Sequence, residues 1–186
     1  MDIIDEIRAY IPKCEQEERD QTVMLAFLAA HDDAFERSSL LAHMTASAWV
    51  ISPDGKKVVM CYHNLYNSWS WTGGHADGDR DLLAVSMREV QEETGLRTHP
   101  AAEGIISLEN LTVDGHVKHG AWVPSHIHMN VTYLLRAEGE TLRAKPDENK
   151  AVRWMTPEEA LAASTEPWMV EHVYRKLADR AKPYME

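Results

Sequence analysis

Three glutamates in one short stretch are the residues of this chain that point most directly to chemistry. Glu89, Glu92 and Glu93 stand at positions i, i+3 and i+4, so on a helix their carboxylates converge on one face. Like charges at this spacing repel unless something neutralises them. Such carboxylates form the oxygen-ligand set that Mg²⁺ or Mn²⁺ prefers. A solvated acidic face is the alternative that these three residues alone leave open.

The residues around the glutamates favour the metal site. Gly73 and Gly74 lie upstream, where a backbone without side chains can approach a phosphate or a metal closely. The whole segment resembles the Nudix box: glycine, five residues, glutamate, seven residues, then Arg-Glu-hydrophobic-x-Glu-Glu-x-Gly-hydrophobic. The positions in register are Gly74, Arg88, Glu89, Val90, Glu92, Glu93, Gly95 and Leu96. Chance agreement of this set is about one in a hundred thousand or rarer at average residue usage.

One position departs from the box. Arg80 stands where the pattern has its first glutamate, after the five residues that follow Gly74. Asp79 or Asp81 is a candidate to take its place, and helix capping by one of them is the alternative.

The resemblance implies an activity and a ligand set. Nudix hydrolases cleave the diphosphate of a nucleoside diphosphate linked to a moiety X, with Mg²⁺ or Mn²⁺ as cofactor. By position, Glu92 and Glu93 are the principal metal ligands, and Glu89 belongs to the same cluster. The main-chain carbonyl of Gly73 is a further ligand, and Arg88 orients the glutamates by ion pairing.

The resemblance extends to a later acidic residue. Family members often have an acid on a loop before a tryptophan-containing strand, and Glu148 precedes Trp154 in this way. We expect Glu148 to be the general base or an extra metal ligand, with a solvated loop acid as the alternative.

Histidines alternate with apolar residues along a predicted strand. His126 and His128 share one face with Asn130, and the apolar face should pack on the core, so that the polar face lines a cleft. We expect the two histidines to contact substrate phosphates or to orient the attacking water. Structural histidines with ordinary hydrogen bonds are the alternative.

The same histidines allow a different class of protein. The spacing from Gly120 through His126 to His128 matches the opening of the cupin metal motif, which belongs to a β-barrel that binds a transition metal through imidazoles. Thr132 and Tyr133 stand where that motif needs a glutamate, which disfavours the cupin interpretation.

Further candidates lie just before the box. His75 follows the two glycines and is predicted to donate to a phosphate or to stabilise the turn. Tyr66, Trp69 and Trp71 offer rings that either stack on a base or belong to the core. Isopentenyl diphosphate isomerases share the fold, but their essential cysteine falls at Gly73, which disfavours that activity.

The carboxylates require a helix held against a sheet, and the apolar pattern predicts both. A helix from about Asp81 to Thr94 ends at Gly95, a suitable C-cap. The other predicted elements are helices at about 3–11 and 15–30, strands at 45–52, 57–63, 104–113 and 127–137, a loop at 64–79, and helices at 157–163 and 168–181. The mixture predicts an α/β or α+β fold, and the resemblance implies a Nudix-type α/β/α sandwich with a mixed sheet. We divide the chain into a helical N-terminal extension, 1–44, and a Nudix domain, 45–186.

The composition and charge of the chain limit the kinds of partner that we expect it to bind. The 186 residues carry 30 acids and 19 bases, for a formal net charge of −11. This charge argues against a nucleic-acid polymer as partner but admits a small phosphorylated ligand bridged by a cation.

Two cysteines exclude a disulfide framework. With neither a signal peptide nor a long apolar run, we expect a cytoplasmic protein without a membrane partner. The N-terminal helices suit either a cover for the core or a homodimer contact.

These observations predict a metal-dependent hydrolase of a small diphosphate-containing metabolite. A non-catalytic Nudix-fold module that binds a nucleotide and regulates a partner is the alternative. The intact set Glu89, Glu92 and Glu93 favours the enzyme, whereas loops that the sequence does not shape choose the moiety X.

Overall fold

The computed structural model describes residues 2–65, 67–118 and 120–185. Tyr66, one of the three aromatic candidates, lies outside that part of the chain. The helices are α1 (Ile3–Ala9), α2 (Glu15–Ala30), α3 (Leu82–Thr94), α4 (Pro157–Ala163), α5 (Pro167–Met169) and α6 (Arg175–Ala181), with a π-helical turn at Val170–Tyr174 and a 3-10 turn at Lys182–Tyr184. The strands are β1 (Ala42–Ile51), β2 (Val58–His63), β3 (Ser68–Ser70), β4 (Thr72–His75), β5 (Thr98–Val113), β6 (His116–Lys118), β7 (Ala121–Val123), β8 (His126–Ala137) and β9 (Asn149–Met155).

Seven strands form one mixed sheet. Its main path runs β3-β2-β1-β8-β5, with β4 paired to β1 and β9 paired to β2. The pairing of β1 with β8 is parallel, and the other pairings in the sheet are antiparallel. The path has two ends and does not close into a barrel, so the cupin-like alternative is wrong about the fold. The expected α/β sandwich with a mixed sheet is confirmed.

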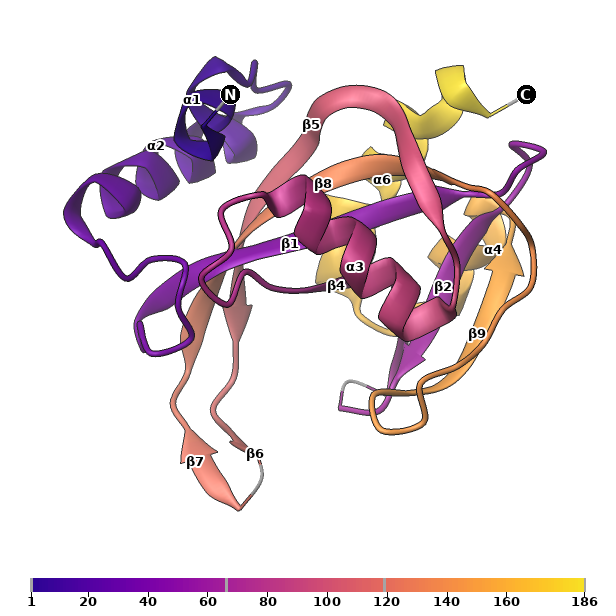
Figure 1. Ribbon diagram of the computed structural model, residues 1–186. Helices are drawn as coiled ribbons and strands as arrows, with labels where there is room; N and C mark the ends of the chain where they lie inside the picture. The colour runs from indigo at the N-terminus through magenta and orange to yellow at the C-terminus, as the bar shows by residue number, and fades with distance from the viewer. Residues whose placement is uncertain (1, 66, 119, 186) are drawn as a thin grey trace.

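Helices cover both faces of this sheet. Figure 1 shows α3 crossing the near face, α4 and α6 behind the sheet, and the β6–β7 hairpin projecting away from it. Alternate residues of β1 divide between the two layers, because successive side chains of a strand point to opposite faces. Ala46 and Val50 pack with Val85 and Val90 of α3, whereas Trp49 packs with Tyr174 on the other side.

Local signals set the ends of α3. The carboxylate of Asp81 accepts a hydrogen bond from the Ala84 amide at 3.0 Å and caps the first turn. Gly95 ends the helix in the left-handed region with φ of 75°, which a residue with a side chain adopts only with strain. The sequence therefore predicted the bounds of this helix closely.

The predicted loop from 64 to 79 is wrong in its middle. It contains β3 and β4, which pair with β2 and β1 respectively. These strands are rich in Ser and Gly and show no strand pattern of their own, so their form comes from the strands beside them. The sequence pattern also did not predict β6 and β7, which pair with each other, or β9, which pairs with the predicted strand β2. The predicted helix at 168–181 is interrupted by the π-helical turn.

The N-terminal helices lie beside the edge strand β5 and join the same core as α3. Ile3, Ile7, Met24 and Leu28 are buried in the cluster that contains Val85 of α3. The helices thus cover the core, as one of the two sequence alternatives proposed. Among the described residues, no helix is both long enough and apolar enough to cross a membrane.

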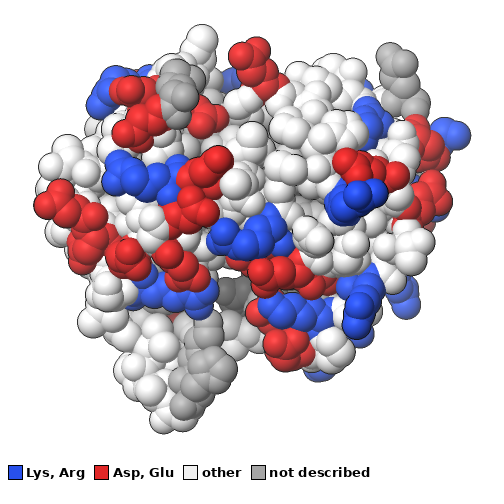
Figure 2. All heavy atoms as spheres, viewed as in Figure 1, with Lys and Arg blue, Asp and Glu red and all other residues white. Residues whose placement is uncertain are grey.

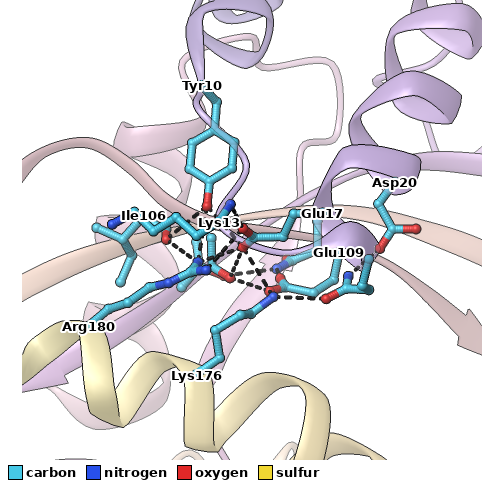
Figure 3. Close-up of polar contacts among 12 residues, drawn as sticks. Tyr10, Lys13, Glu17, Asp20, Ile106, Glu109, Lys176 and Arg180 are labelled. Carbon is cyan, nitrogen blue, oxygen red and sulfur yellow. Dashed lines mark hydrogen bonds and ion pairs between the residues drawn. The ribbon is translucent and has the colours of Figure 1, made fainter.

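A buried group of charges fastens these helices to the C-terminal helix. Glu17 of α2 is 0% exposed and accepts hydrogen bonds from Arg180 and from the Tyr10 hydroxyl. Lys176 reaches Glu17 at 3.2 Å and Glu109 of β5 at 2.8 Å. Figure 3 shows the side chains of α2, β5 and α6 pointing toward one another at this junction. The ion pairs therefore join three elements that are far apart in sequence.

Candidate active site

The two glycines of β4 set the distance between the sheet and the acidic helix. The Gly73 amide donates a hydrogen bond to the Glu93 carboxylate at 3.0 Å. A side-chain carbon added to Gly74 would collide with the carboxylate of Glu89. Glycine at position 74 therefore allows α3 to bring Glu89 against the backbone of β4, whereas a side chain at Gly73 would collide with Ser47 of β1.

Burial changes the acidity of these glutamates. Glu93 is 5% exposed, and burial raises its pKa to about 8, although the hydrogen bond from Gly73 opposes the shift. The pKa of Glu89 is also raised, first by burial and then by the neighbouring charge of Glu92. Keeping both buried side chains in the charged form costs free energy. A bound cation would offset that cost.

A lysine lies between two more carboxylates of the site. The Lys145 ammonium is 3.2 Å from Glu92 and 2.9 Å from Glu148. Asn149 donates to the main-chain carbonyl of Glu93 at 3.0 Å, which fixes the loop that carries Glu148 against the end of α3. The structure therefore brings Glu148 beside the box, and charge from Glu148 raises the pKa of Glu89 and of Glu93.

Arg88 and the two aspartates have separate structural roles. Arg88 lies 3.9 Å from Glu89 and 3.3 Å from Asp79, so it contacts Glu89 and not Glu92. Asp79 also accepts a hydrogen bond from the Asp81 amide, whereas Asp81 caps α3. The capping alternative therefore holds for Asp81.

Arg80, which replaces the first glutamate of the box, turns away from the acidic cluster. Its guanidinium lies 3.8 Å from Asp2 and 4.4 Å from the centre of the Phe35 ring. Both partners precede β1. Arg80, the residue that departs from the box pattern, thus contacts the N-terminal segment.

The acidic residues fit a divalent cation. Glu89 and Glu93 lie against the Gly73–Gly74 backbone, and Lys145 links Glu92 to Glu148 beside them. All the donors are oxygen atoms, the kind that Mg²⁺ and Mn²⁺ prefer. The Lys145 ammonium lies between Glu92 and Glu148, so these two carboxylates share its positive charge.

The predicted histidines meet a fourth imidazole that sequence reasoning missed. His75, His126 and His128 lie with His43, and each offers one ligand atom within 4.8 Å of the others. Ring centroids of neighbouring pairs are 4.7 to 5.1 Å apart. Burial, followed by the other imidazoles, lowers the pKa of His128 to about 2. The signal that could have revealed His43 is its place two residues before Thr45 on a strand of alternating polar residues.

The predicted alternation of β8 is confirmed, and its polar face meets the polar face of β1. Thr45 and Ser47 both donate to the side-chain carbonyl of Asn130, at 3.1 and 2.8 Å. Asn130 in turn donates to Glu109 at 3.4 Å. Hydrogen bonds therefore connect the polar faces of β1 and β8 to Glu109, one of the buried charges under α2.

Both tryptophans pack against the same core cluster. Trp71 packs edge-on against Tyr174, with ring centroids 5.7 Å apart, and belongs to the core cluster beneath α6. Trp69 lies edge-on to Tyr62 and below the guanidinium of Arg153. Stacking of either ring on a base stays a prediction.

Gly74 provides a test of the close approach between β4 and α3. We expect Gly74→Ala to fold, because the three atoms nearest to the added methyl group all belong to the flexible Glu89 side chain and not to the backbone. Displacement of that carboxylate should lower metal-dependent activity by about 100-fold, since a misplacement of about 1 Å has this effect. Steady-state rates together with thermal unfolding would measure it. Gly139→Ala is the matched control, because nothing lies within 4 Å of the added carbon. Full activity of Gly74→Ala would show that Glu89 does not act from its observed position.

Most of the acidic residues lie outside this cluster. Figure 2 shows acidic side chains spread over the face that carries α3, with basic side chains among them, whereas the projecting hairpin is nearly free of charged colour. The negative net charge is therefore mainly a property of the solvated surface.

Comparison with known proteins places these features in a family. A family model described as NUDIX domain matches residues 41–177. The m7GpppN-mRNA hydrolase NUDT17 of Xenopus laevis is 36% identical over 99 residues, which are 50% of this chain and 32% of that protein. The human protein of the same name is 29% identical over 105 residues, 53% of this chain and 32% of that protein. The chain thus spans about a third of the length of these curated relatives.

Solved structures share the architecture. A NUDIX-family hydrolase from Clostridium perfringens matches with a TM-score of 0.54 at 17% identity, over 76% of this chain and 97% of that chain. The dihydroneopterin triphosphate pyrophosphohydrolase of E. coli matches with a TM-score of 0.54 at 15% identity, over 76% of this chain and 94% of that chain. At such identities the likeness shows the fold alone.

Proposed function

This chain belongs to the NUDIX domain family, and we propose that it is a metal-dependent hydrolase of phosphoanhydride bonds. Its substrate would be a nucleoside diphosphate linked to a second moiety, or a related small diphosphate-containing metabolite. The observation that carries the proposal is the approach of Glu89 and Glu93 to the Gly73–Gly74 backbone, with Glu92 and Glu148 beside them.

The metal of this proposal is Mg²⁺ or Mn²⁺. Glu89, Glu92, Glu93 and the Gly73 carbonyl would hold it, in agreement with their oxygen donors and their burial. When bound, such a cation neutralises the diphosphate and stabilises the charge that develops during in-line attack.

The other residues would position substrate and move a proton. Arg88 holds Glu89 and Asp79 from one side, which restricts the glutamate to one orientation. Glu148 is 44% exposed and lies on a loop pinned by Asn149, so its carboxylate is accessible to a water molecule. We assign Glu148 as the general base. Lys145, next to it, would donate to a phosphate oxygen of the substrate.

Lys145 also competes with the cation, and this gives a second prediction. Lys145→Gln removes a positive charge shared by Glu92 and Glu148. We expect the Kd for Mg²⁺ to fall by about two- to five-fold, because partly exposed ion pairs contribute about 0.5–1 kcal/mol. Calorimetric titration without substrate measures it. Lys150→Gln, on the exposed part of β9, is the control, and unchanged or weaker Mg²⁺ binding by Lys145→Gln would contradict the shared site.

The names of the relatives suggest the compounds to assay. Those names specify m7GpppN-mRNA, Ap4A, dihydroneopterin triphosphate and ADP-ribose as substrates of the respective proteins. A suitable panel therefore contains m7GpppN-mRNA, dihydroneopterin triphosphate, dinucleoside polyphosphates, ADP-ribose, nucleotide sugars and nucleoside triphosphates, each with Mg²⁺ or Mn²⁺. Metal-dependent cleavage of a panel member supports the hydrolase. Tight nucleotide binding without turnover of any member would instead favour the regulatory module.

A further inference from the structure

Four imidazoles from three strands meet at one end of the sheet. His43 lies on β1, His75 on β4, and His126 and His128 on β8. Their ligand atoms all lie within 4.8 Å of one another, so the four residues form a group that could hold a metal ion. The acidic cluster of α3 does not include any of these histidines, so they form a second chemical centre.

The strand register explains why the four side chains meet. His43 is the parallel partner of His128, and Thr45, two residues further along β1, is the antiparallel partner of His75. Residues two apart on a strand point to the same face. His126 and His43 therefore share that face with His75 and His128.

Hydrogen bonds fix two of the rings with the same nitrogen directed into the cluster. Nδ1 of His43 lies 3.0 Å from the Ser39 carbonyl, and Nδ1 of His126 lies 2.9 Å from the Pro124 carbonyl. A carbonyl can only accept, so each Nδ1 donates, which leaves the lone pair of each Nε2 to accept a hydrogen bond or to bind a metal. A metal-bound histidine characteristically donates its other nitrogen in this way.

One nitrogen atom inside the cluster lacks a hydrogen-bond partner. Nε2 of His43 is buried and has no hydrogen-bond partner, which is unfavourable for a buried polar atom. Nε2 of His126 and Nε2 of His128 share a hydrogen bond at 3.0 Å, in which one nitrogen donates and the other accepts. The cluster therefore holds a buried nitrogen, Nε2 of His43, that no hydrogen bond satisfies and that a bound cation would satisfy.

We propose that His43, His75, His126 and His128 bind one Zn²⁺ ion through four nitrogen atoms. Imidazole suits zinc and other late first-row metals, whereas Mg²⁺ takes oxygen ligands. Four protein ligands close a tetrahedral site, as in structural zinc centres. The site is thus chemically distinct from the acidic cluster.

The place of His75 gives this zinc site a role in positioning the box. His75 directly follows Gly73 and Gly74, whose backbone meets Glu93 and Glu89. In the described sheet, β4 pairs with β1 alone. A metal that bridges His75 to β1 and β8 would fix this short edge strand and, through it, the approach of the acidic helix.

Cobalt substitution tests the site without any substrate. Metal-free protein titrated with Co²⁺ should show the intense visible absorption of a four-coordinate ion, and this absorption should saturate at one equivalent per chain. Zn²⁺ should displace it and, at about 100 times its Kd, raise Tm by about 5–10 °C. X-ray absorption of the zinc-loaded wild type should show nitrogen neighbours near 2.0–2.1 Å, as expected for imidazole ligands. Carboxylate ligation, or no saturable uptake, would overturn the proposal.

Variants separate this site from the acidic one. His75→Ala and His128→Ala, at half-buried positions, should each weaken Co²⁺ binding by at least about 100-fold, because loss of outer partners alone costs 10–100-fold. His172→Ala, an exposed histidine of the π-helical turn, should bind normally. The Glu92→Gln/Glu93→Gln double variant should keep the cobalt spectrum. Retention by both histidine variants, or loss in the glutamate variant, would show that the four imidazoles are not the ligands.

Discussion

Glu93→Gln is expected to lower metal-dependent hydrolysis by about 100- to 1,000-fold on whichever diphosphate the panel identifies. Metal neutralisation of the transition state contributes several kcal/mol, and a tenfold loss of rate corresponds to about 1.4 kcal/mol. Glu93 holds its oxygen atoms against Gly73 and beside Glu89. An amide at this position keeps the shape of the side chain but removes the negative charge that binds the cation.

The fold should tolerate this change. Glu93 is buried, and burial raises its pKa to about 8, so a neutral side chain already suits the metal-free protein. The Gln side chain can still accept the hydrogen bond from the Gly73 amide. Thermal unfolding without metal should therefore match the wild type within about 1 kcal/mol.

The control for Glu93→Gln is a glutamate of similar size outside the site. Glu171 is 62% exposed and pairs with Arg175 one helical turn away. Glu171→Gln should leave both the rate and its dependence on Mg²⁺ concentration unchanged. Wild-type turnover by Glu93→Gln at limiting Mg²⁺ would remove Glu93 from the proposed ligand set.

Glu17→Gln should destabilise the protein by about 3–5 kcal/mol, the loss measured when one partner of a buried ion pair is removed. Glu17 is fully buried and contacts Arg180, Lys176 and Tyr10. The change leaves Arg180, which is 11% exposed, without its carboxylate. For a chain of this length, Tm should fall by about 6–20 °C.

The same ion pairs predict how stability depends on pH. Burial alone would raise the pKa of Glu17, but Arg180, the Lys13 amide and Lys176 lower it to about 2. Between pH 4.5 and pH 2 the unfolded chain binds the proton more tightly than the folded one, so this stabilisation is lost as pH falls. Glu17→Gln should show a weaker loss of stability over that range in urea unfolding.

Two variants make this result specific. Glu18→Gln changes the adjacent, exposed glutamate of α2 and should alter stability by less than about 0.5 kcal/mol. Glu17→Met combined with Arg180→Met should be more stable than Glu17→Gln, because apolar residues can replace a buried pair when both charges are removed. Equal stability of Glu17→Gln and wild type would show that the ion pairs do not hold α2 to α6.

The sequence predicted what depends on neighbouring residues along the chain. Periodic apolar residues, the Asp81 cap and Gly95 define α3 locally, so its bounds could be predicted to within a residue. The helix period also places Glu89 and Glu93 on one face, and the box pattern names the family. The short strands β3 and β4 could not be predicted, because their hydrogen bonds come from β2 and β1.

Tertiary structure decided which distant residues meet. His43 joins His128 through a parallel strand pairing across 85 positions, and the site then needs His75 from a third strand. Glu17 meets Arg180 across 163 positions. No local propensity encodes such contacts, since they depend on strand order and helix packing. The sequence by itself thus determined the acidic helix and the family, whereas only the folded chain determined the histidine cluster, the contacts of Arg80 and the anchoring of the N-terminal helices.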